Sequence, residues 1–301
     1  MTTDTLATGL AFTQTEHTVT GILYIVLGIL GIIGNGTLAV MLARLKTTQA
    51  SKYQLHIQFA IANILVVAGF PFTGSSSIAG RWLFGSVGCQ AYSFEGMLAG
   101  IASIGFVIAV CIERYVATCC KETYRTKYPN SSNTIVLLIW GNALFWGLMP
   151  LLGWCRYGLE PTGVSCTINY QIVDQQYKSF ILALFCCCFA ILWPIALICL
   201  MKAYSALART PASERDREKE AFTEEQITAM SFTSLMLSVI GWTPFAFICL
   251  YSLLYDSTQI SHLGATLPPL LAKGSTVLHP LLYLVAGSRL QGSFSSRRKS
   301  Q

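Results

Sequence analysis

Long stretches without acidic or basic side chains recur along the chain, separated by short polar segments. Each of these apolar stretches can cross roughly 30 Å of hydrocarbon as an α-helix, at about 1.5 Å per residue. The uninterrupted stretches lie near 21-43, 53-79, 131-153, 179-201 and 226-254, and two more, about 89-112 and 263-287, each contain a single charged residue, Glu95 and Lys273. The pattern therefore predicts an all-α membrane protein, a bundle of seven transmembrane helices.

The composition agrees with this prediction. Asp, Glu, Lys and Arg make up 11% of the 301 residues, where a soluble domain carries roughly 25%. The connections are short except near 155-176 and 202-225, so no room is left for a separate soluble domain. We expect residues 1-301 to form one seven-transmembrane domain.

The distribution of Lys and Arg predicts the orientation of the helices in the membrane. With the N-terminus outside, 16 of the 20 basic residues fall in cytoplasmic segments, and three, Arg81, Arg156 and Lys178, fall outside. We therefore expect the N-terminus outside and the C-terminus in the cytoplasm. The net charge of +6 is explained by this topology, so nucleic-acid binding is not expected. The basic tail residues 297-299 fit the same signal, with contact to anionic membrane lipid as the alternative.

Three cysteines are expected at the outer side of the membrane, which faces an oxidising compartment. Cys89 begins the third stretch, and Cys155 and Cys166 lie in the loop after the fourth. A disulfide between Cys89 and Cys166 would tie that loop over the bundle. Cys155 is the competing partner, but it directly follows Trp154 at the membrane edge, and we expect it to be free. The Cys186-Cys187-Cys188 cluster has no His or carboxylate beside it, so no metal site is expected.

Lys273 is the residue that indicates chemistry. It lies about ten residues into the last stretch, roughly 15 Å deep at helical rise. An ammonium group at that depth costs at least roughly 2.5 kcal/mol, and the lysine side chain is too short to reach an interface from there. A structural accident is the alternative, and it explains the residue less well.

Two chemistries suit such a lysine. A charge relay in a transporter needs several acids inside the membrane, whereas the stretches contain only Glu95. A Schiff base with an aldehyde ligand needs a neutral amine, which removal from water favours. A protonated Schiff base also needs a nearby anion, and the candidates are Glu95, with Tyr92 one helical turn before it, and Glu160 in the outer loop. The residues alone leave these two carboxylates equal.

The motifs of the stretches resemble those of rhodopsin-like G-protein-coupled receptors over nearly the whole chain. The matching residues are Gly34-Asn35, Cys89, Glu113-Arg114-Tyr115, Trp140, Pro194, Trp242-Thr243-Pro244 and Pro280-Leu281-Leu282-Tyr283. Lys273, at its depth in the last stretch, narrows the resemblance to animal opsins. Residues 75-90, 149-170, 223-230 and 261-273 are most similar to the retinochrome group of opsins, which are light-driven retinal isomerases.

The resemblance implies the roles of several residues. Lys273 would carry retinal, Cys89 would pair with Cys166, and Glu160, six residues before Cys166, would be the counterion in preference to Glu95. Tyr92 occupies the position that holds a carboxylate in vertebrate visual opsins. The implied pocket comprises Tyr92, Glu95, Gly96, Gly100, Ile168, Tyr170, Trp242, Phe245, Ala246 and Ala272.

Two functions remain open at this point. A retinochrome-like protein would bind all-trans-retinal in the dark, convert it to 11-cis-retinal in light without a catalytic acid or base, and pass the product to a visual opsin through a soluble retinoid carrier. A bistable opsin would instead activate a G protein. Either would be a multi-pass membrane protein of photoreceptor cells, in the plasma membrane or an intracellular membrane.

Several signalling positions depart from the receptor pattern. Asn63 stands where most receptors have Asp, His279 where most have Asn, and Lys202 where a tyrosine is usual. These departures weaken the case for coupling to a G protein. Glu113, Arg114 and Glu224 nevertheless retain the elements of a cytoplasmic ionic lock, which is either a switch or a static link between two helices.

Overall fold

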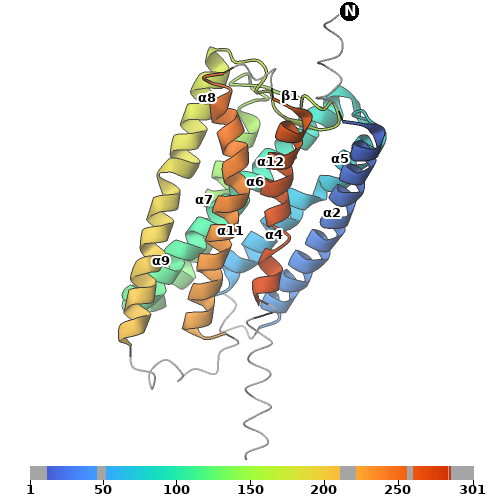
Figure 1. The fold of residues 1–301 in the computed structure, drawn as a ribbon. Helices are drawn as coiled ribbons and strands as arrows, with labels where there is room; N and C mark the ends of the chain where they lie inside the picture. The colour runs from blue at the N-terminus through green and yellow to red at the C-terminus, as the bar shows by residue number, and fades with distance from the viewer. Residues whose placement is uncertain (1–11, 46–51, 211–221, 256–259, 284, 286–301) are drawn as a thin grey trace, which may run out of the picture.

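The structure, a computed structural model, describes residues 12–45, 52–210, 222–255, 260–283 and 285. Within these ranges the helices lie side by side in one bundle, and a short β-hairpin covers one end of it (Figure 1). The helices are α2 (Gln14–Ala43), α4 (Gln54–Ala68), α5 (Phe70–Ile78), α6 (Gly85–Cys119), α7 (Lys121–Leu148), α8 (Gln175–Phe185), α9 (Leu192–Arg209), α11 (Glu224–Tyr251) and α12 (His262–Ser275). A π-helical segment, η1 (Cys186–Ala190), joins α8 to α9.

The helices account for the seven predicted spans. Five helical segments among the described residues are long and apolar enough to cross a membrane: α2, α4 with α5, α6, α8 through α9, and α11. The other two predicted spans correspond to α7 and α12. The fold class is confirmed, and the orientation in the membrane stays a prediction from the Lys and Arg count.

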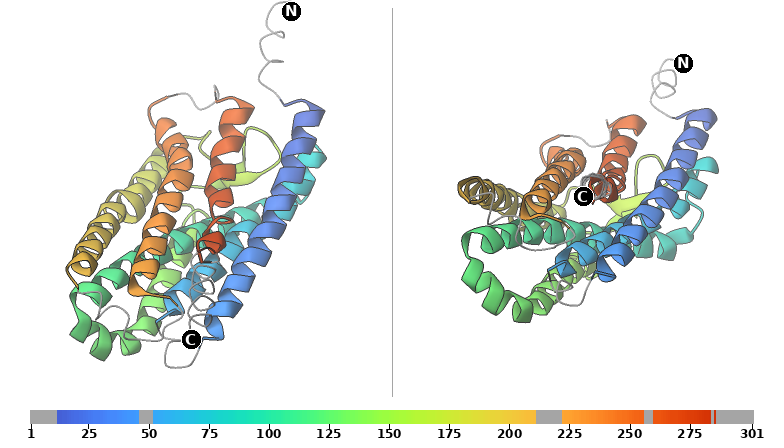
Figure 2. Two further views of the ribbon diagram at one scale, coloured as in Figure 1. Left: turned by 60° about the horizontal axis from the view of Figure 1, so that its bottom comes forward. Right: turned by 90° about the horizontal axis from the view of Figure 1, so that it is seen from below.

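Helix α6 is the central element of the bundle. It contacts α4, α7, α9 and α11, and both strands of the hairpin rest on it. Figure 2 shows α6, coloured teal to green, running obliquely across the bundle. Ala102, Phe106 and Val107 near its middle are fully buried in the main hydrophobic core. A side chain on α6 can therefore face several neighbouring helices.

Two helices end differently from the sequence prediction. α7 stops at Leu148 rather than near 153, because turns follow and Gly153 has a φ of 97°, a backbone region that favours glycine. α12 stops at Ser275, a turn covers 276–278, and helix resumes at 279–283. The break has a clear cause: Pro280 has no N–H to bond the carbonyl of Thr276.

Asn35 compensates for that break from a neighbouring helix. Its side-chain amide donates to the carbonyl of Thr276 at 3.1 Å and to that of Gly31 at 3.0 Å. Gly34 makes the close approach possible, since an added Cβ there would lie 3.3 Å from the ring of Pro280. The Gly34-Asn35 and Pro280 motifs thus form one contact between α2 and the last span.

The hairpin pairs β1 (Tyr157–Leu159) with β2 (Cys166–Ile168) in antiparallel register, Tyr157 opposite Ile168. Its turn is closed by hydrogen bonds from Glu160 N to Ser165 O and from Gly163 N to Glu160 O, both 2.9 Å. The disulfide between Cys89 and Cys166 is present and ties β2 to the start of α6. Cys155, the predicted competitor, is a free, buried thiol. The hairpin is therefore held firmly over the bundle end.

Candidate functional site

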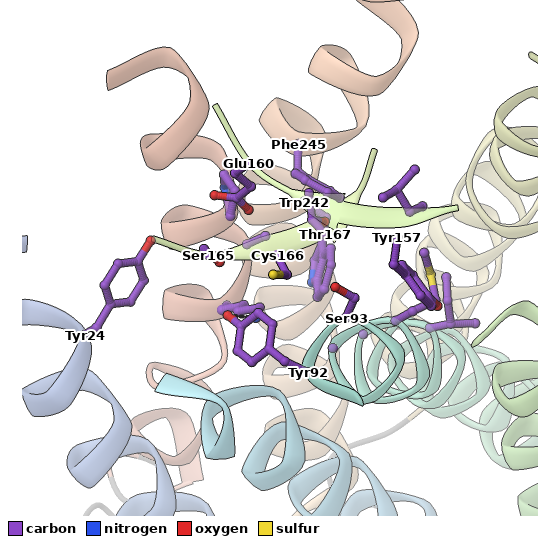
Figure 3. Close-up of a pocket in the computed structure, with 18 residues that line it drawn as sticks. Tyr24, Tyr92, Ser93, Tyr157, Glu160, Ser165, Cys166, Thr167, Trp242 and Phe245 are labelled. Atoms are coloured by element: carbon purple, nitrogen blue, oxygen red, sulfur yellow. Dashed lines mark hydrogen bonds between the residues drawn. The ribbon is translucent and has the colours of Figure 1, made fainter. Parts of the chain in front are cut away.

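A cavity lies beneath the hairpin, between α2, α6, α11 and α12. Figure 3 shows the hairpin crossing it, with Tyr24, Tyr92 and Glu160 reaching it from three separate elements. Its lining residues are Tyr24, Tyr92, Ser93, Gly96, Met97, Gly100, Ile101, Tyr157, Glu160, Ser165, Cys166, Thr167, Ile168, Trp242, Phe245, Pro269, Ala272 and Lys273. A predominantly apolar wall with a few polar groups is typical of small-molecule sites.

Lys273 supplies the amine of this cavity. Its Nζ donates to the Tyr92 hydroxyl at 2.7 Å and lies 4.3 Å from the centre of the Tyr92 ring. The same hydroxyl accepts a second hydrogen bond, from Thr73 Oγ1 at 2.6 Å. No carboxylate of the described residues forms an ion pair with Lys273. The amine is thus positioned by a phenol and is not neutralised by direct contact with an acid.

Glu160 is the carboxylate in the cavity wall. It sits in the hairpin turn and is only 6% exposed. Burial raises its pKa to about 7, although the positive charge of Lys273 and a hydrogen bond with Ser165 act in the opposite direction. A carboxyl group in this setting changes its charge readily when its surroundings change.

Glu95 lies near Lys273 but not in the cavity wall. Both of its carboxylate oxygens are buried and receive no hydrogen bond from the part of the chain that is described. It faces the junction of α4 and α5 at Gly69, where an added Cβ would lie 3.3 Å from its Oε2. Of the two candidate acids, only Glu160 therefore lines the cavity.

Two glycines on α6 make room for the cavity. A Cβ added at Gly100 would lie 2.5 Å from Cη2 of Trp242, and one added at Gly96 would lie 3.5 Å from Nζ of Lys273. The indole of Trp242 therefore rests directly on the backbone of α6. Any larger residue at position 100 would push this ring into the cavity.

Most of the residues that the sequence singled out meet at the cavity. Its wall includes Tyr92, Gly96, Gly100, Glu160, Ile168, Trp242, Phe245, Ala272 and Lys273. Three others lie elsewhere: Glu95 beside Gly69, Tyr170 buried with its hydroxyl unpaired among the described residues, and Ala246 in an adjoining apolar cavity with Phe185 and Phe189.

The sequence did not indicate Tyr24 or Thr73. Tyr24 comes from α2, and Thr73, which bonds Tyr92, comes from α5. Tyrosine and threonine are common in such stretches, and no motif marks these two. Their roles follow only from the way in which the helices pack.

The predicted ionic cluster is found at the opposite end of the bundle. Arg114 is fully buried and bonds Glu113 through Nε at 2.9 Å and Nη2 at 2.5 Å. Its Nη1 bonds Glu224 on α11 at 2.8 Å. Lys52, just before α4, adds a further ion pair to Glu224 at 2.5 Å. The cluster thus joins α6 to α11, and Lys52 adds the turn before α4 to this link.

Comparison with known proteins identifies the family to which this fold belongs. The family model described as 7 transmembrane receptor (rhodopsin family) matches residues 34–283. The chain belongs to the rhodopsin family of seven-transmembrane receptors. It is similar to retinochrome of Todarodes pacificus, 38% identical over 92% of this chain and 93% of the relative. It also resembles the human visual pigment-like receptor peropsin, 29% identical over 97% of this chain and 88% of that protein.

The structure gives the same picture for the fold. The crystal structure of squid rhodopsin matches with a TM-score of 0.83 at 22% identity, covering 95% of this chain and 86% of the other. The protein is thus a multi-pass membrane protein and a retinochrome-like opsin. An opsin implies a retinal chromophore.

The residues of the cavity suit that chromophore. Retinal needs a primary amine for its aldehyde and an apolar enclosure for its polyene, and Lys273 and the aromatic and aliphatic wall supply them. Gly96 and Gly100 leave open the space beside the amine and beneath Trp242. The chemistry that retinal supplies is the absorption of light and the turning of a double bond.

Proposed function

We propose that this opsin binds all-trans-retinal at Lys273 through a protonated Schiff base and serves as a light-driven isomerase that yields 11-cis-retinal. The observation that carries the proposal is the position of Lys273, the one amine in an enclosed apolar cavity of a chain 38% identical to retinochrome. The photon supplies the energy, so the protein needs no general acid or base for the isomerisation itself.

The residues of the wall have separate tasks in this proposal. Glu160 faces the cavity and provides the negative charge that keeps the Schiff base protonated. Tyr92 holds the nitrogen on one side. Trp242 and Phe245 on α11, opposite the α6 backbone at Gly100, restrict which part of a long ligand can turn.

Release of the product defines the partners we propose. The 11-cis-retinal would leave for a visual opsin with a soluble retinoid carrier, and the protein would reside in photoreceptor cells. Lipid surrounds the apolar outer faces of the helices, where Ile29, Leu137 and Ile240 are exposed.

The isomerase is tested directly by extracting the chromophore. Purified protein is mixed with all-trans-retinal in the dark, its visible band is recorded, and the isomers are extracted before and after illumination. We expect a visible band and mainly 11-cis-retinal after light. Failure to bind all-trans-retinal, or a different main photoproduct, would overturn the proposal.

Two substitutions test the site. Lys273→Ala should abolish the visible band completely, whereas Lys178→Ala, an exposed lysine on α8, should leave it unchanged. Glu160→Gln should move the absorption into the near ultraviolet at neutral pH, because the Schiff base then loses its proton. If Glu95→Gln has that effect and Glu160→Gln does not, Glu95 is the counterion.

A second candidate function is signalling through a heterotrimeric G protein. The family membership and the ion-paired Arg114 favour it, since such a cluster can open when the helices move. Light-dependent nucleotide exchange on an added G protein would establish this function. Its absence, together with isomer conversion, would leave the isomerase alone.

A further inference from the structure

Glu95 is a buried carboxyl group close to Lys273 for which the proposed photochemistry has no task. It follows Tyr92 by three residues on α6, so both side chains lie on one face of that helix. At the Cβ position of Gly69, Tyr92 Cε2 is 2.8 Å away and Glu95 Oε2 is 3.3 Å away. The Tyr92 ring and the Glu95 carboxylate are therefore neighbours, and the Tyr92 hydroxyl bonds Lys273.

Glu95 and Glu160 are the two acids near the lysine. Glu160 lines the cavity, whereas Glu95 does not. The buried oxygens of Glu95 have no hydrogen-bond partner among the described residues. Glu95 is thus an acid near the amine that does not face the ligand space.

Attachment of an aldehyde to this lysine requires a proton to move twice. The ammonium nitrogen has three hydrogens and no lone pair, so it must first lose one proton before it can attack the aldehyde carbon. The N–C bond then forms, the C–O bond breaks, and the oxygen leaves as water. Two of the three hydrogens depart with that water and one stays on nitrogen, so no proton is consumed overall. A nearby group must accept one proton early and return it later.

We propose that Glu95 is this proton acceptor and donor, and that it acts through the Tyr92 hydroxyl. This inference rests on the proposed attachment of retinal at Lys273. Tyr92 accepts hydrogen bonds from Lys273 and Thr73, which leaves its own hydrogen to donate. The Tyr92 hydroxyl takes the proton from the amine and passes its own to Glu95, and the return follows the same path. Neither Glu95 oxygen is hydrogen-bonded to this hydroxyl in the structure, so the Tyr92 side chain must move toward Glu95 for the proton to pass. The Thr73 hydroxyl holds the phenol beside Lys273.

Glu160 is poorly suited to the same task. In the proposed function it must keep its negative charge beside the protonated Schiff base, so it cannot also hold the proton that the amine gave up. The oxygens of Glu95, in contrast, are not engaged by hydrogen bonds from the described residues. The two acids therefore have separate roles. Glu160 stabilises the protonated Schiff base, and Glu95 takes part in its formation and hydrolysis.

The rate of dark uptake tests the proposal. Full-length protein in lipid nanodiscs is mixed with all-trans-retinal, and the rise of the visible band is followed over time. We expect Glu95→Gln to slow the rise at least tenfold while the final band keeps its position and amplitude. Glu95→Asp, which retains the carboxyl group, should recover part of the rate, and the exposed Glu225→Gln should match the wild type.

The direction of the effect separates a proton acceptor from a simple neighbouring charge. Loss of a negative charge alone would leave more of the lysine as free amine and would speed uptake. Equal or faster uptake by Glu95→Gln therefore overturns the proposal, as does a shift of its band into the near ultraviolet. Tyr92→Phe should slow uptake as much as Glu95→Gln, and the double variant should be no slower than either. Additive losses would overturn the shared path.

A measurement without retinal keeps this inference distinct from the proposed function. Apoprotein is treated with formaldehyde and a borane reductant, and methylation of Lys273 is followed by peptide mass spectrometry. We expect Glu95→Gln to slow this labelling as well, because attack on any aldehyde needs the same proton transfer. Glu95-dependent labelling in a protein that fails to bind retinal would overturn the function and retain the proton path. Labelling that does not depend on Glu95 would overturn the proton path.

Discussion

Two cations, the half-buried Lys273 and the fully buried Arg114, lie toward opposite ends of the bundle and differ in the partners that surround them. Arg114 makes charge-assisted bonds to Glu113 and Glu224, and Glu113 is held in turn by the Tyr124 hydroxyl at 2.7 Å. Lys273 has one hydrogen bond, to a phenol, and no ion pair among the described residues. One cation is saturated with partners and the other is not.

The difference shows that two positively charged side chains can have different roles in one protein. Arg114 stabilises the packing of helices, whereas Lys273 is available to react. A guanidinium held by two carboxylates has little tendency to change its state, since removing either partner leaves a charge uncompensated. An amine without an acid in contact can lose its proton and react. Four experiments test this contrast, ordered by the size of the expected effect.

The largest effect should come from breaking the Arg114 cluster. Glu113 is 3% exposed and accepts two bonds from the guanidinium, so Glu113→Ala should lower the free energy of unfolding by about 3 to 5 kcal/mol. Thermal unfolding in detergent measures this. The exposed Glu122→Ala, at the start of α7, serves as control and should change little. A small loss for Glu113→Ala would mean that Arg114 does not depend on its partners.

The next effect concerns pH at the lysine end. Because burial raises the pKa of Glu160 from 4.5 to about 7, its contribution to stability is complete below pH 4.5 and is lost as the pH rises through about 7. The loss should amount to roughly 3 kcal/mol at most. Unfolding of the retinal-free protein at pH 5 to 8 measures it. Glu160→Gln should remove this part of the pH dependence, and parallel curves for the two proteins would contradict the assignment.

Overpacking beside the lysine should have an intermediate effect. Gly100→Ala places a methyl group 2.5 Å from Trp242 and should cost about 1 to 3 kcal/mol of stability. The displaced indole should also lower the affinity for retinal. Gly141→Ala on α7 is a matched control, because nothing lies within 4 Å of its added Cβ. Equal stability of the two variants would show that the cavity adapts freely.

The smallest effect should come from Lys52. Its partner Glu224 has a side chain that is 35% exposed, and ion pairs near the surface contribute roughly 0.2 to 1 kcal/mol. Lys52→Gln should therefore destabilise the protein by less than about 1 kcal/mol. A loss comparable to that of Glu113→Ala, in the same unfolding experiment, would make Lys52 an equal member of the cluster.

The sequence predicted the features that depend on one residue in its apolar surroundings. Lys273 was identifiable because a charge at that depth is rare, and Cys89 and Cys166 because the family resemblance supplies the pairing. Features that depend on side-chain direction were not predictable. Glu95 packs beside Gly69, where α4 ends and α5 begins, and no pattern in α6 reveals this contact.

The same limit applies to contacts between distant segments. Thr73 and Tyr92 meet only because α5 packs beside α6, and Lys52 reaches Glu224 across 172 positions of sequence. The breaks in the spans were also hard to locate. Pro280 predicts a break in the last span. The residue at which α12 ends depends also on Asn35 of α2.

The π-helical segment η1 affects how this chain should be aligned with its relatives. A π turn holds one more residue than an α turn, so it shifts the helical phase of α8 against α9 by about 100°. It ends four residues before Pro194, where the carbonyl of Ala190 lacks its usual donor. Deleting one residue between 186 and 190 would restore a regular helix yet turn Tyr177 and Phe180, both buried, away from the core. An alignment with a relative that has no π turn here therefore needs a gap between 186 and 190. Without that gap, every residue of α8 is matched one position out of register.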